Sequence, residues 1–225
     1  MTTAASSLVH LLTWLSPAFP TGAYAYSHGL EWAVEAGDVR DEAGLVQWLD
    51  AVLRHGSGRS DAVLLRHAHR CTSADALVEV AELAAAAQPG RERQAETLAQ
   101  GGAFVLAARV WGAPLLDEAA ARIGAERIAT PIAVGALAAA HGVDEDAACP
   151  ALLHAFTAHL VSAAVRLVPL GQTAGLRALA ALEPAVHVVA AETRAAGLDD
   201  LGGACFRSDI ASLRHETQYT RLFRS

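Results

Sequence analysis

Large apolar residues recur along this chain with the period of an α-helix. After Asp41 they stand at the positions that share one helical face, and the members of this face are Leu45, Trp48, Leu49, Val52 and Leu53. A sustained alternation of apolar and polar residues, which marks a half-buried strand, is not found in the sequence. The pattern therefore predicts an all-α fold, with Asp41 as the expected N-cap of this helix.

Prolines, glycines and capping residues divide the rest of the chain into further helices. The expected ranges are 7–15, 24–36, 60–70, 73–87, 92–110, 130–141, 144–167, 173–182 and 184–196. Because no linker is long enough to divide domains, the pattern predicts a single-domain helical bundle of roughly nine to eleven helices over residues 1–225. Residues 198–225 are expected to form a loop followed by a C-terminal tail that docks a partner.

Two of these helices carry predictions about packing. The helix over 144–167 is apolar on nearly its whole circumference, so it is expected at the centre of the domain. The helix over 92–110 contains the pair Gly101–Gly102, which lowers its helical propensity. The pair predicts that a neighbouring backbone approaches closely at this point.

The composition excludes several functions. The chain is 53% hydrophobic and only 18% charged, so it is not disordered and must bury a large core. A formal net charge of −7 argues against a nucleic-acid partner. All 17 basic residues are arginine. The lack of lysine excludes Schiff-base catalysis and the phosphate-binding loop GxxxxGK(S/T).

No segment has the pattern of a leader peptide or a membrane anchor. Residues 1–30 contain no charged side chain, but they lack the basic start of a signal peptide and are interrupted by prolines and glycines. The other uncharged stretch, 147–165, is expected to be a buried helix rather than a membrane span. Cys71, Cys149 and Cys205 form no CxxC pair. We therefore expect a soluble, cytoplasmic protein with reduced thiols and no membrane contact.

The sequence shows no catalytic centre. Ten histidines are present, but Tyr219 stands where the zinc-protease pattern HExxH, begun by His215 and Glu216, requires its second histidine. The serine-hydrolase, cysteine-protease and dinucleotide-binding patterns are absent as well. These observations favour a binding or scaffold protein over an enzyme, and they predict no catalytic residue and no stable metal site. A helical metallohydrolase built on scattered His, Asp and Glu residues is a remote alternative.

Three stretches are too unusual for an ordinary core. The first, residues 17–31, crowds prolines, glycines and tyrosines beside one acid, and its marked positions are Pro17, Pro20, Gly22, Tyr26, Gly29 and Glu31. The second, residues 162–173, holds the isolated cation Arg166, which must be paired or must reach solvent or a partner. The third, residues 209–225, combines large apolar side chains with arginines. That composition is typical of an interface rather than of a frayed chain end.

Together these stretches resemble the motifs of a known family. SPAFPTGAYAYSHGLE, which ends at Glu31, resembles the SPALPxGGFSYSQGLE opening of the urease accessory protein UreF family. SAAVRLVPLGQT resembles the central SAAVRLxPLGQT segment of that family, and DIASLRHETQYTRLFRS resembles its closing DIAxMRHETQYSRLFRS. The matches occur in the family's order. The departures include Ala23 in place of a glycine and His28 in place of a glutamine.

The resemblance implies an all-helical, dimerising, non-catalytic subunit of the urease maturation machinery. Members of this family bind the accessory protein UreD, also called UreH, and through it recruit the GTPase UreG to apo-urease. Nickel passes through that assembly during its insertion, so no cofactor is expected to stay bound to this chain. A GTPase-activating or fidelity-regulating role toward UreG, acting in trans, is an alternative.

The resemblance also suggests roles for individual residues. The predicted UreD-docking residues of the tail are Arg214, His215, Glu216, Gln218, Tyr219, Arg221, Leu222, Phe223 and Arg224. The predicted residues of a dimer surface or a GTPase-facing surface are Arg166, Pro169 and Gln172. A candidate nickel route passes His28 and Glu31. The tail is expected to be disordered when UreD is absent.

Overall fold

The computed structural model describes residues 3–225, a range that contains helices and short connections and no strand. The α-helices are α1 (Ala4–Trp14), α2 (Leu30–Glu35), α3 (Glu42–His55), α4 (Ser57–Arg70), α5 (Ala74–Ala86), α6 (Arg91–Ala108), α7 (Pro114–Ile123), α8 (Thr130–Ala140), α9 (Glu145–Leu167), α10 (Gln172–Glu192) and α11 (Phe206–His215). The all-α prediction is confirmed. The number of α-helices, eleven in the described range, lies at the upper limit of the prediction.

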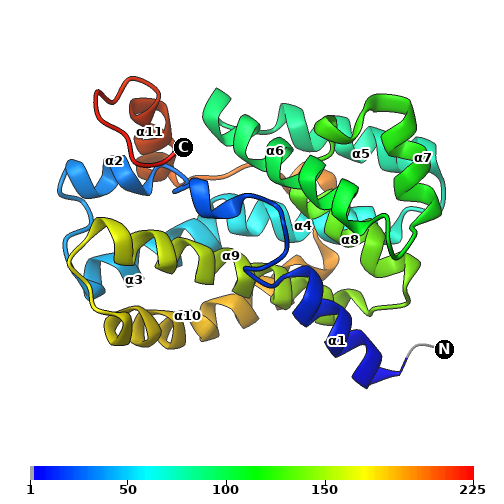
Figure 1. Cartoon of the computed structure of the whole chain (residues 1–225), viewed down its shortest axis with the longest axis horizontal. Helices are drawn as coiled ribbons and strands as arrows, with labels where there is room; N and C mark the ends of the chain where they lie inside the picture. Colours follow the sequence, from blue (N-terminus) through cyan, green and yellow to red (C-terminus); the bar gives the residue numbers. More distant parts are fainter. Residues whose placement is uncertain (1–2) are drawn as a thin grey trace.

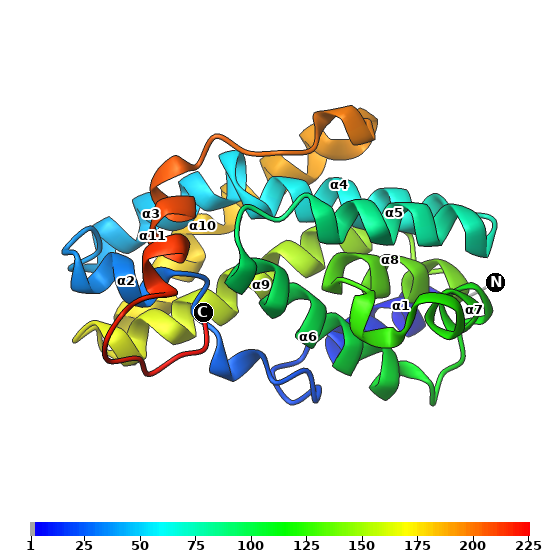
Figure 2. The same cartoon turned by 90° about the horizontal axis from the view of Figure 1, so that it is seen from above.

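The molecule is elongated, and its helices pack around α4, α8 and α9 (Figure 1). α4 packs against α8 and α9, and α9 packs in turn against α10. α5 and α7 lie at one end, whereas α2, α3 and α11 gather at the other end together with the C-terminus (Figures 1 and 2). The buried apolar side chains form one continuous core.

α9 is buried on opposite sides, as its apolar circumference predicts. Leu152 and Val161, which lie on opposite sides of this helix at 3.6 residues per turn, are both buried, and Leu153 and Leu160 are buried on the face between them. α9 and the segment Gln172–Ala195 also have the length and hydropathy that a membrane span requires, but 50% and 39% of their apolar windows are buried inside the protein. Length and composition do not distinguish a membrane span from the core helix of a folded domain.

The Gly101–Gly102 pair lies where α6 meets the segment before α8. A β-carbon on Gly101 would lie 2.0 Å from the carbonyl oxygen of Ile128. Only a glycine permits such an approach, because the contact falls on backbone that cannot move aside. The predicted close packing is confirmed.

The helix predicted over residues 24–36 is wrong in its first half. His28 and Gly29 have positive φ angles of 63° and 77°, which a right-handed helix does not allow. A single 3-10 turn over Ala23–Ala25 is followed by extended backbone, and α2 starts only at Leu30. The apolar pattern predicts a helix through Gly29, whereas the left-handed conformation of this glycine forms the N-cap of α2.

The two helices predicted on either side of Pro184 are one helix, α10. Proline removes one backbone hydrogen bond from a helix and disturbs the carbonyl four residues earlier. Here Pro184 and Ala180 both lie on the exposed side of α10, so water can bond the carbonyl that is left free. The prediction failed because the penalty of proline depends on which side of the helix is covered.

α4 begins at Ser57 and not at Ser60. Gly56 alone joins α3 to α4, and a β-carbon on Gly58 would lie 2.8 Å from the Cα of Leu53. The two glycines therefore allow α3 and α4 to meet at a tight turn, and no longer loop separates the helices. α7, which starts at a proline, is absent from the predicted elements.

Candidate functional site

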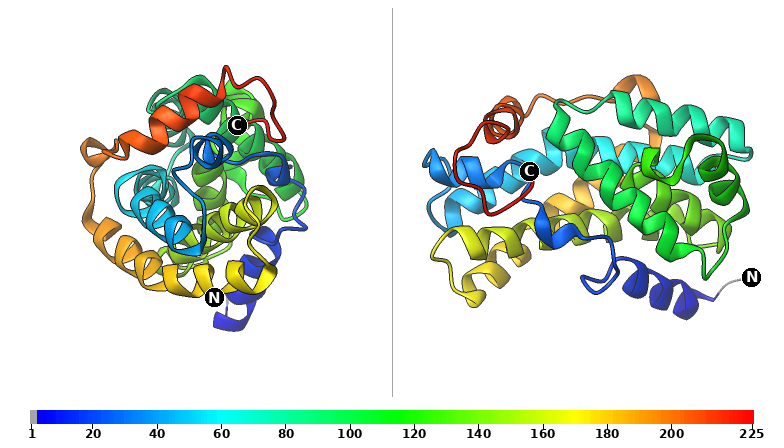
Figure 3. Two further views of the ribbon diagram at one scale, coloured as in Figure 1. Left: turned by 90° about the vertical axis from the view of Figure 1, so that its left-hand side faces the viewer. Right: turned by 45° about the horizontal axis from the view of Figure 1, so that its top comes forward.

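The unusual stretches of the sequence meet at one place. Residues 216–225, here called the tail, leave α11 and turn back across α2 to reach the N-terminal segment (Figures 1 and 3). That receiving segment, residues 24–31, is here called the cradle. Two main-chain hydrogen bonds join them. The N–H of Ser27 donates to the carbonyl of Ser225 (2.9 Å), and the N–H of Arg224 donates to the carbonyl of Ala25 (2.8 Å).

Glu31 holds the tail by its backbone. Its carboxylate oxygens accept hydrogen bonds from the N–H groups of Leu222 (2.6 Å) and Phe223 (2.9 Å). The second of these oxygens also lies 3.1 Å from Nε2 of His215, the last residue of α11. Glu31 is only 8% exposed, so these donors replace the water that a buried carboxylate otherwise needs.

A second carboxylate lies on the other side of His215. Nδ1 of His215 is 2.7 Å from Glu92 on α6, and the other oxygen of Glu92 accepts a hydrogen bond from Arg221 of the tail (2.9 Å). His215 is completely buried. Its ring therefore links α2, α6 and α11, which explains why a polar side chain stands at this buried position.

Ser225 lies buried in the cradle. Its carbonyl also accepts a hydrogen bond from the hydroxyl of Ser27, and its own hydroxyl donates to Glu96 (2.7 Å). Glu96 lies in turn 3.3 Å from Nδ1 of His28. The tail thus connects the cradle to α6 through polar groups as well as through the backbone.

Arg166 supplies the contact of the central stretch. Its guanidinium donates to the carbonyl of Tyr24 (3.0 Å) and lies over the rings of Tyr24 and Phe223, 3.8 Å and 4.3 Å from their centroids. The isolated charge is therefore held within the chain by a carbonyl and two aromatic faces, while its second terminal nitrogen, Nη2, is buried without a hydrogen-bond partner among the described residues. Pro169 and Gln172 lie apart from this contact, exposed at the turn between α9 and α10.

Backbone geometry brings α11 against the cradle. A β-carbon on Gly29, which has a φ of +77°, would lie 2.7 Å from the backbone nitrogen of Ser212 in α11. Glycine is required here both for its φ and for the close approach. The six positions marked in the first stretch divide into two groups. Three are buried in the cradle, namely Tyr26, Gly29 and Glu31. The other three are exposed in the loop before it, namely Pro17, Pro20 and Gly22.

In this structure the tail is packed against its own chain, and disorder of the tail without UreD stays a prediction. Of the predicted docking residues, His215, Gln218 and Phe223 are buried against the chain itself. The amide of Gln218 donates to Glu35 on α2 (2.6 Å). These three side chains hold the tail in place and present no surface to a partner.

The tail and α11 expose apolar and basic groups to solvent. Tyr219 is fully exposed, Leu222 is 67% exposed, and α11 adds Phe206, Ile210 and Leu213 at helical spacing on its outer side. We call these five side chains the outer face. Charged residues stand beside them: the exposed Arg207, Arg214, Arg221 and Arg224, and the half-buried Glu216. Phe206 precedes the sequence motif and was not predicted; its spacing from Ile210 is the signal that could have revealed it.

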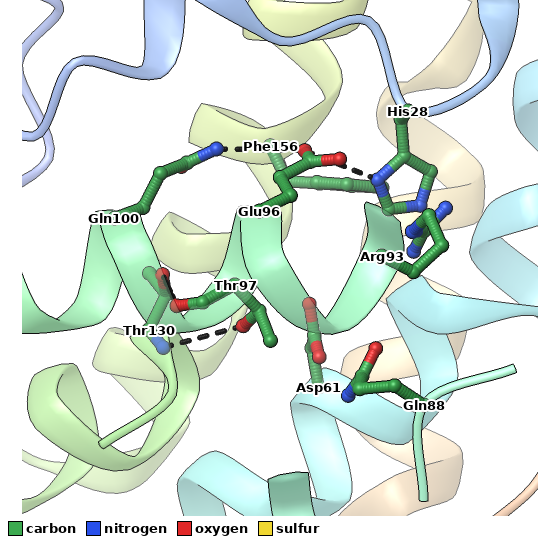
Figure 4. A pocket seen from close by; sticks show the side chains of 9 residues that line it. All are labelled: His28, Asp61, Gln88, Arg93, Glu96, Thr97, Gln100, Thr130 and Phe156. Carbon is green, nitrogen blue, oxygen red and sulfur yellow. Dashed lines mark hydrogen bonds and ion pairs between the residues drawn. The ribbon is translucent and has the colours of Figure 1, made fainter. Parts of the chain in front are cut away.

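A small polar cavity lies behind the cradle (Figure 4). Its volume is about 40 Å³, and it is lined by His28, Asp61, Gln88, Arg93, Glu96, Thr97, Gln100, Thr130 and Phe156. Arg93 is 4% exposed, and its Nε has no hydrogen-bond partner among the described residues. A polar cavity of this size can hold a few water molecules, which would satisfy such a group.

Burial sets the charges around this cavity. Burial lowers the pKa of His28 to about 4, and Arg93 acts in the same direction while Glu96 opposes it. Burial raises the pKa of Asp61 to about 7, against the effect of Arg93. Burial opposes the ionisation of Glu96, but His28, Arg93 and the Ser225 hydroxyl together lower its pKa to about 2. At neutral pH, Glu96 is therefore ionised beside the Arg93 cation, and His28 is neutral.

Known proteins resemble this chain in sequence over nearly its whole length. The profile of the UreF family matches residues 39–183, well over half of the chain. The chain belongs to the UreF family. A protein of Bradyrhizobium sp. (strain BTAi1) named urease accessory protein UreF is 56% identical over 223 residues, which cover 97% of this chain and 92% of that relative.

Two further relatives carry the same name. The protein of Rhodopseudomonas palustris (strain TIE-1) is 57% identical over 224 residues, covering 98% of this chain and 93% of the relative. The protein of Bradyrhizobium diazoefficiens is 53% identical over 227 residues, which cover 98% of this chain and 93% of that relative. The resemblance stated from the sequence is confirmed, and membership of the family supports a role in urease maturation.

Replacing His28 with glutamine, the residue of the family motif, is expected to reduce the sensitivity of the fold to acid. The folded-state pKa of about 4 lies below the ordinary value of 6.5, so between these values unfolding takes up a proton and stability falls as the pH drops. When the pH is lowered from about 7.5 to about 4.5, the free energy of unfolding of the parent should fall by roughly 2 kcal/mol more than that of His28→Gln. Urea denaturation at both pH values measures this difference, and any effect of the substitution that does not depend on pH cancels.

His55→Gln is the matched control, because the side chain of His55 is exposed at the end of α3. Its loss of stability over the same interval should equal that of the parent. Equal losses for His28→Gln and the parent would contradict the assignment of His28 as a buried, neutral histidine.

A nickel route past His28 and Glu31 stays a prediction. Both oxygens of Glu31 already accept hydrogen bonds, and the ring nitrogens of His28 lie 3.3 Å from Glu96 and 2.7 Å from the hydroxyl of Ser57. Over residues 3–225, no group of three or more His, Cys, Asp or Glu side chains is placed to hold a metal ion. A nickel ion taking this route has to replace hydrogen bonds that are already made.

Proposed function

We propose that this protein is a non-catalytic scaffold of urease maturation that binds UreD through the outer face. One observation carries the proposal: large apolar side chains, among them Tyr219 and Ile210, are exposed on a segment whose backbone the cradle holds in place. Aromatic and apolar groups beside arginines are typical of binding hot spots. Burial of such groups by a partner removes apolar surface from water, which favours association.

The charges beside the outer face specify the chemistry of the partner. Arg207, Arg214, Arg221 and Arg224 are exposed there, so a complementary surface is apolar at its centre and acidic at its rim. UreD is the proposed occupant, because the tail matches the closing motif of the family and family members bind UreD. Arg221 also pairs with Glu92, which keeps its guanidinium in a fixed place for such a contact.

Binding of UreD is proposed to recruit the GTPase UreG and to bring the assembly to apo-urease in the cytoplasm. Nickel is then the cargo of the complex and not a resident cofactor of this chain. Pro169 and Gln172 are proposed for the GTPase-facing surface because both are exposed at one turn. Arg166 contributes to that surface indirectly, since its guanidinium lies over Tyr24 and Phe223.

A second copy of the chain is proposed to bind along α9 and α10, the helices that flank this turn. Between them lies a groove of about 440 Å³ lined by Pro150, His154, Leu176, Leu179, Ala180, Glu183, Val186 and His187. A two-fold interface pairs a surface with itself, and the groove carries both an acidic and a basic side chain, Glu183 and His187. Leu176 is 68% exposed. Leu176→Asp is therefore expected to shift the protein from dimer to monomer in light scattering, and a wild-type monomer would contradict the proposal.

Co-purification of the full-length chain with UreD and UreG tests the proposed function. A complex with UreD alone, and with UreG only when UreD is present, is the expected result. Deleting the chain from Asp209 onward is not a suitable test, because His215 and Phe223 belong to the packed domain. Failure of the full-length chain to bind UreD would overturn the proposal.

The exposed arginines also support a second candidate function, an arginine finger acting on UreG in trans. Arg214 and Arg224 are exposed and free to insert, whereas Arg166 is held by Tyr24. Single-turnover GTP hydrolysis by UreG, measured with and without this protein, decides between the two. Stimulation that is lost in Arg214→Ala or Arg224→Ala would support the finger, and inhibition would dismiss it. A tightly held stoichiometric metal in the purified protein would instead favour the metallohydrolase.

A further inference from the structure

Glu31 is nearly buried, and every hydrogen bond described for its carboxylate goes to the tail or to the end of α11. We propose that Glu31 is a positioning residue for docking: it does not touch the partner, and it fixes the conformation in which the tail presents Leu222 and Tyr219. The proposal rests on the docking function proposed above.

The carboxylate sets which side chains of the tail face outward. It accepts the N–H groups of two successive residues, Leu222 and Phe223. The chain bends at these two residues, and with both N–H groups turned toward Glu31 their side chains lie in different environments: Leu222 is 67% exposed, whereas Phe223 is 5% exposed. A shift of the tail by one residue would exchange them, placing the phenyl ring outside and removing it from Arg166. Glu31 therefore fixes the register of the tail.

The charge of Glu31 and the packed conformation of the tail stabilise each other. A buried carboxylate is stable only with donors around it, and the described donors are Leu222, Phe223 and His215. If the tail leaves, the charge of Glu31 loses two backbone donors at once. The packed conformation of the tail is favoured for this reason, although residues 217–222 are not helical.

Other contacts keep the tail attached when Glu31 is replaced. The hydrogen bonds between Ser27 and Ser225, and between Arg224 and Ala25, do not involve its side chain. The tail of a Glu31 variant is therefore loosened and samples several registers, of which only a fraction can bind. The association rate of the variant then falls in proportion to the share of molecules whose tail is in the binding register. The dissociation rate of the correctly formed complex stays unchanged. A residue that touches the partner behaves differently, because its loss acts mainly on dissociation.

The test compares Glu31→Ala and Glu31→Gln with two controls. Glu35→Gln alters a carboxylate on the same helix that contacts the tail only through the side chain of Gln218. Leu222→Ala alters the outer face and leaves the backbone hydrogen bond to Glu31 in place. Amide hydrogen exchange of residues 222 and 223 is measured in the free chain, and association and dissociation rates are measured with purified UreD.

For Glu31→Ala we expect amide exchange at residues 222 and 223 to be faster by about tenfold or more, since charge-assisted hydrogen bonds are lost. Association with UreD should slow by about tenfold, with the dissociation rate within about twofold of the parent. Glu31→Gln keeps one acceptor oxygen, so its amide exchange rate and its association rate should lie between those of the parent and of Glu31→Ala. Glu35→Gln should match the parent, and Leu222→Ala should dissociate faster with normal exchange at residue 223.

Several outcomes would overturn the proposal. Unchanged exchange in Glu31→Ala would show that the carboxylate does not hold the tail, and faster exchange with unchanged association would show that its position does not matter for docking. If Glu31→Ala does not fold, the same criteria apply to Glu31→Gln. Failure of the parent to bind UreD would refute the docking function instead. The exchange measurement would still decide whether Glu31 fixes the conformation of the tail.

Discussion

Replacing Ile210 and Tyr219 together with aspartate is expected to abolish binding to UreD, weakening it by at least about a hundredfold, without unfolding the protein. Ile210 is 55% exposed and Tyr219 is fully exposed, so neither side chain supports the core. Burying each of them in an interface is worth roughly 1.5–3 kcal/mol. A charge placed in the same apolar contact adds the penalty of its own desolvation. Titration calorimetry with purified UreD measures the loss.

The double variant should keep the melting temperature of the parent. Aspartate at position 210 stands four residues before Arg214 on α11, a spacing that permits a favourable ion pair. Val110→Asp is the matched control, because Val110 is 80% exposed and lies at the end of α6 away from α11. Wild-type affinity of the double variant, or an equal loss in Val110→Asp, would refute the assignment of the outer face.

Replacing Gly101 with alanine is expected to destabilise the protein by about 3 kcal/mol or more, since overpacking against fixed backbone forces elements apart. The new β-carbon would lie 2.0 Å from the carbonyl oxygen of Ile128 and 2.6 Å from the backbone of Thr130. Neither atom belongs to a flexible side chain, so α6 and the start of α8 must separate. Urea denaturation, with the midpoint and the slope both recorded, measures the change.

Gly102→Ala provides the control within the same helix. Its β-carbon would have nothing nearer than 3.1 Å, the carbonyl oxygen of Ala125. A contact of that length requires a small adjustment, and alanine is favoured over glycine inside a helix by up to about 1 kcal/mol. The two effects nearly cancel, so the stability of this variant should stay close to that of the parent. Equal destabilisation by both substitutions would contradict the geometry at Gly101.

Local rules predicted the elements whose ends they govern. Asp41 and Ser73 cap α3 and α5 through their side chains, as the sequence indicates. The apolar circumference of α9 and the close approach at Gly101 were also predictable, because each depends on a pattern within one helix. The break before Leu30 and the unbroken course through Pro184 were not predictable, since they depend on backbone angles and on which side of a helix is covered.

The sequence by itself determined the fold class, the family and the three stretches of unusual composition. It also indicated that the last residues are not loose, because a disordered end cannot bury large apolar groups. Only the tertiary structure decided which of those residues are buried. Side chains of one segment divide between core and solvent according to what packs against them, and for the tail that surface is the cradle, which lies almost two hundred residues earlier.

For this reason the resemblance assigned Phe223, Gln218 and His215 to a partner, whereas the structure packs them against α2, α6 and Arg166. The role of Glu31 was also decided by the fold. Its hydrogen bonds go to backbone N–H groups, and every residue except proline carries the same N–H group. A sequence contains no record of such a bond, so only the path of the chain in space can show it.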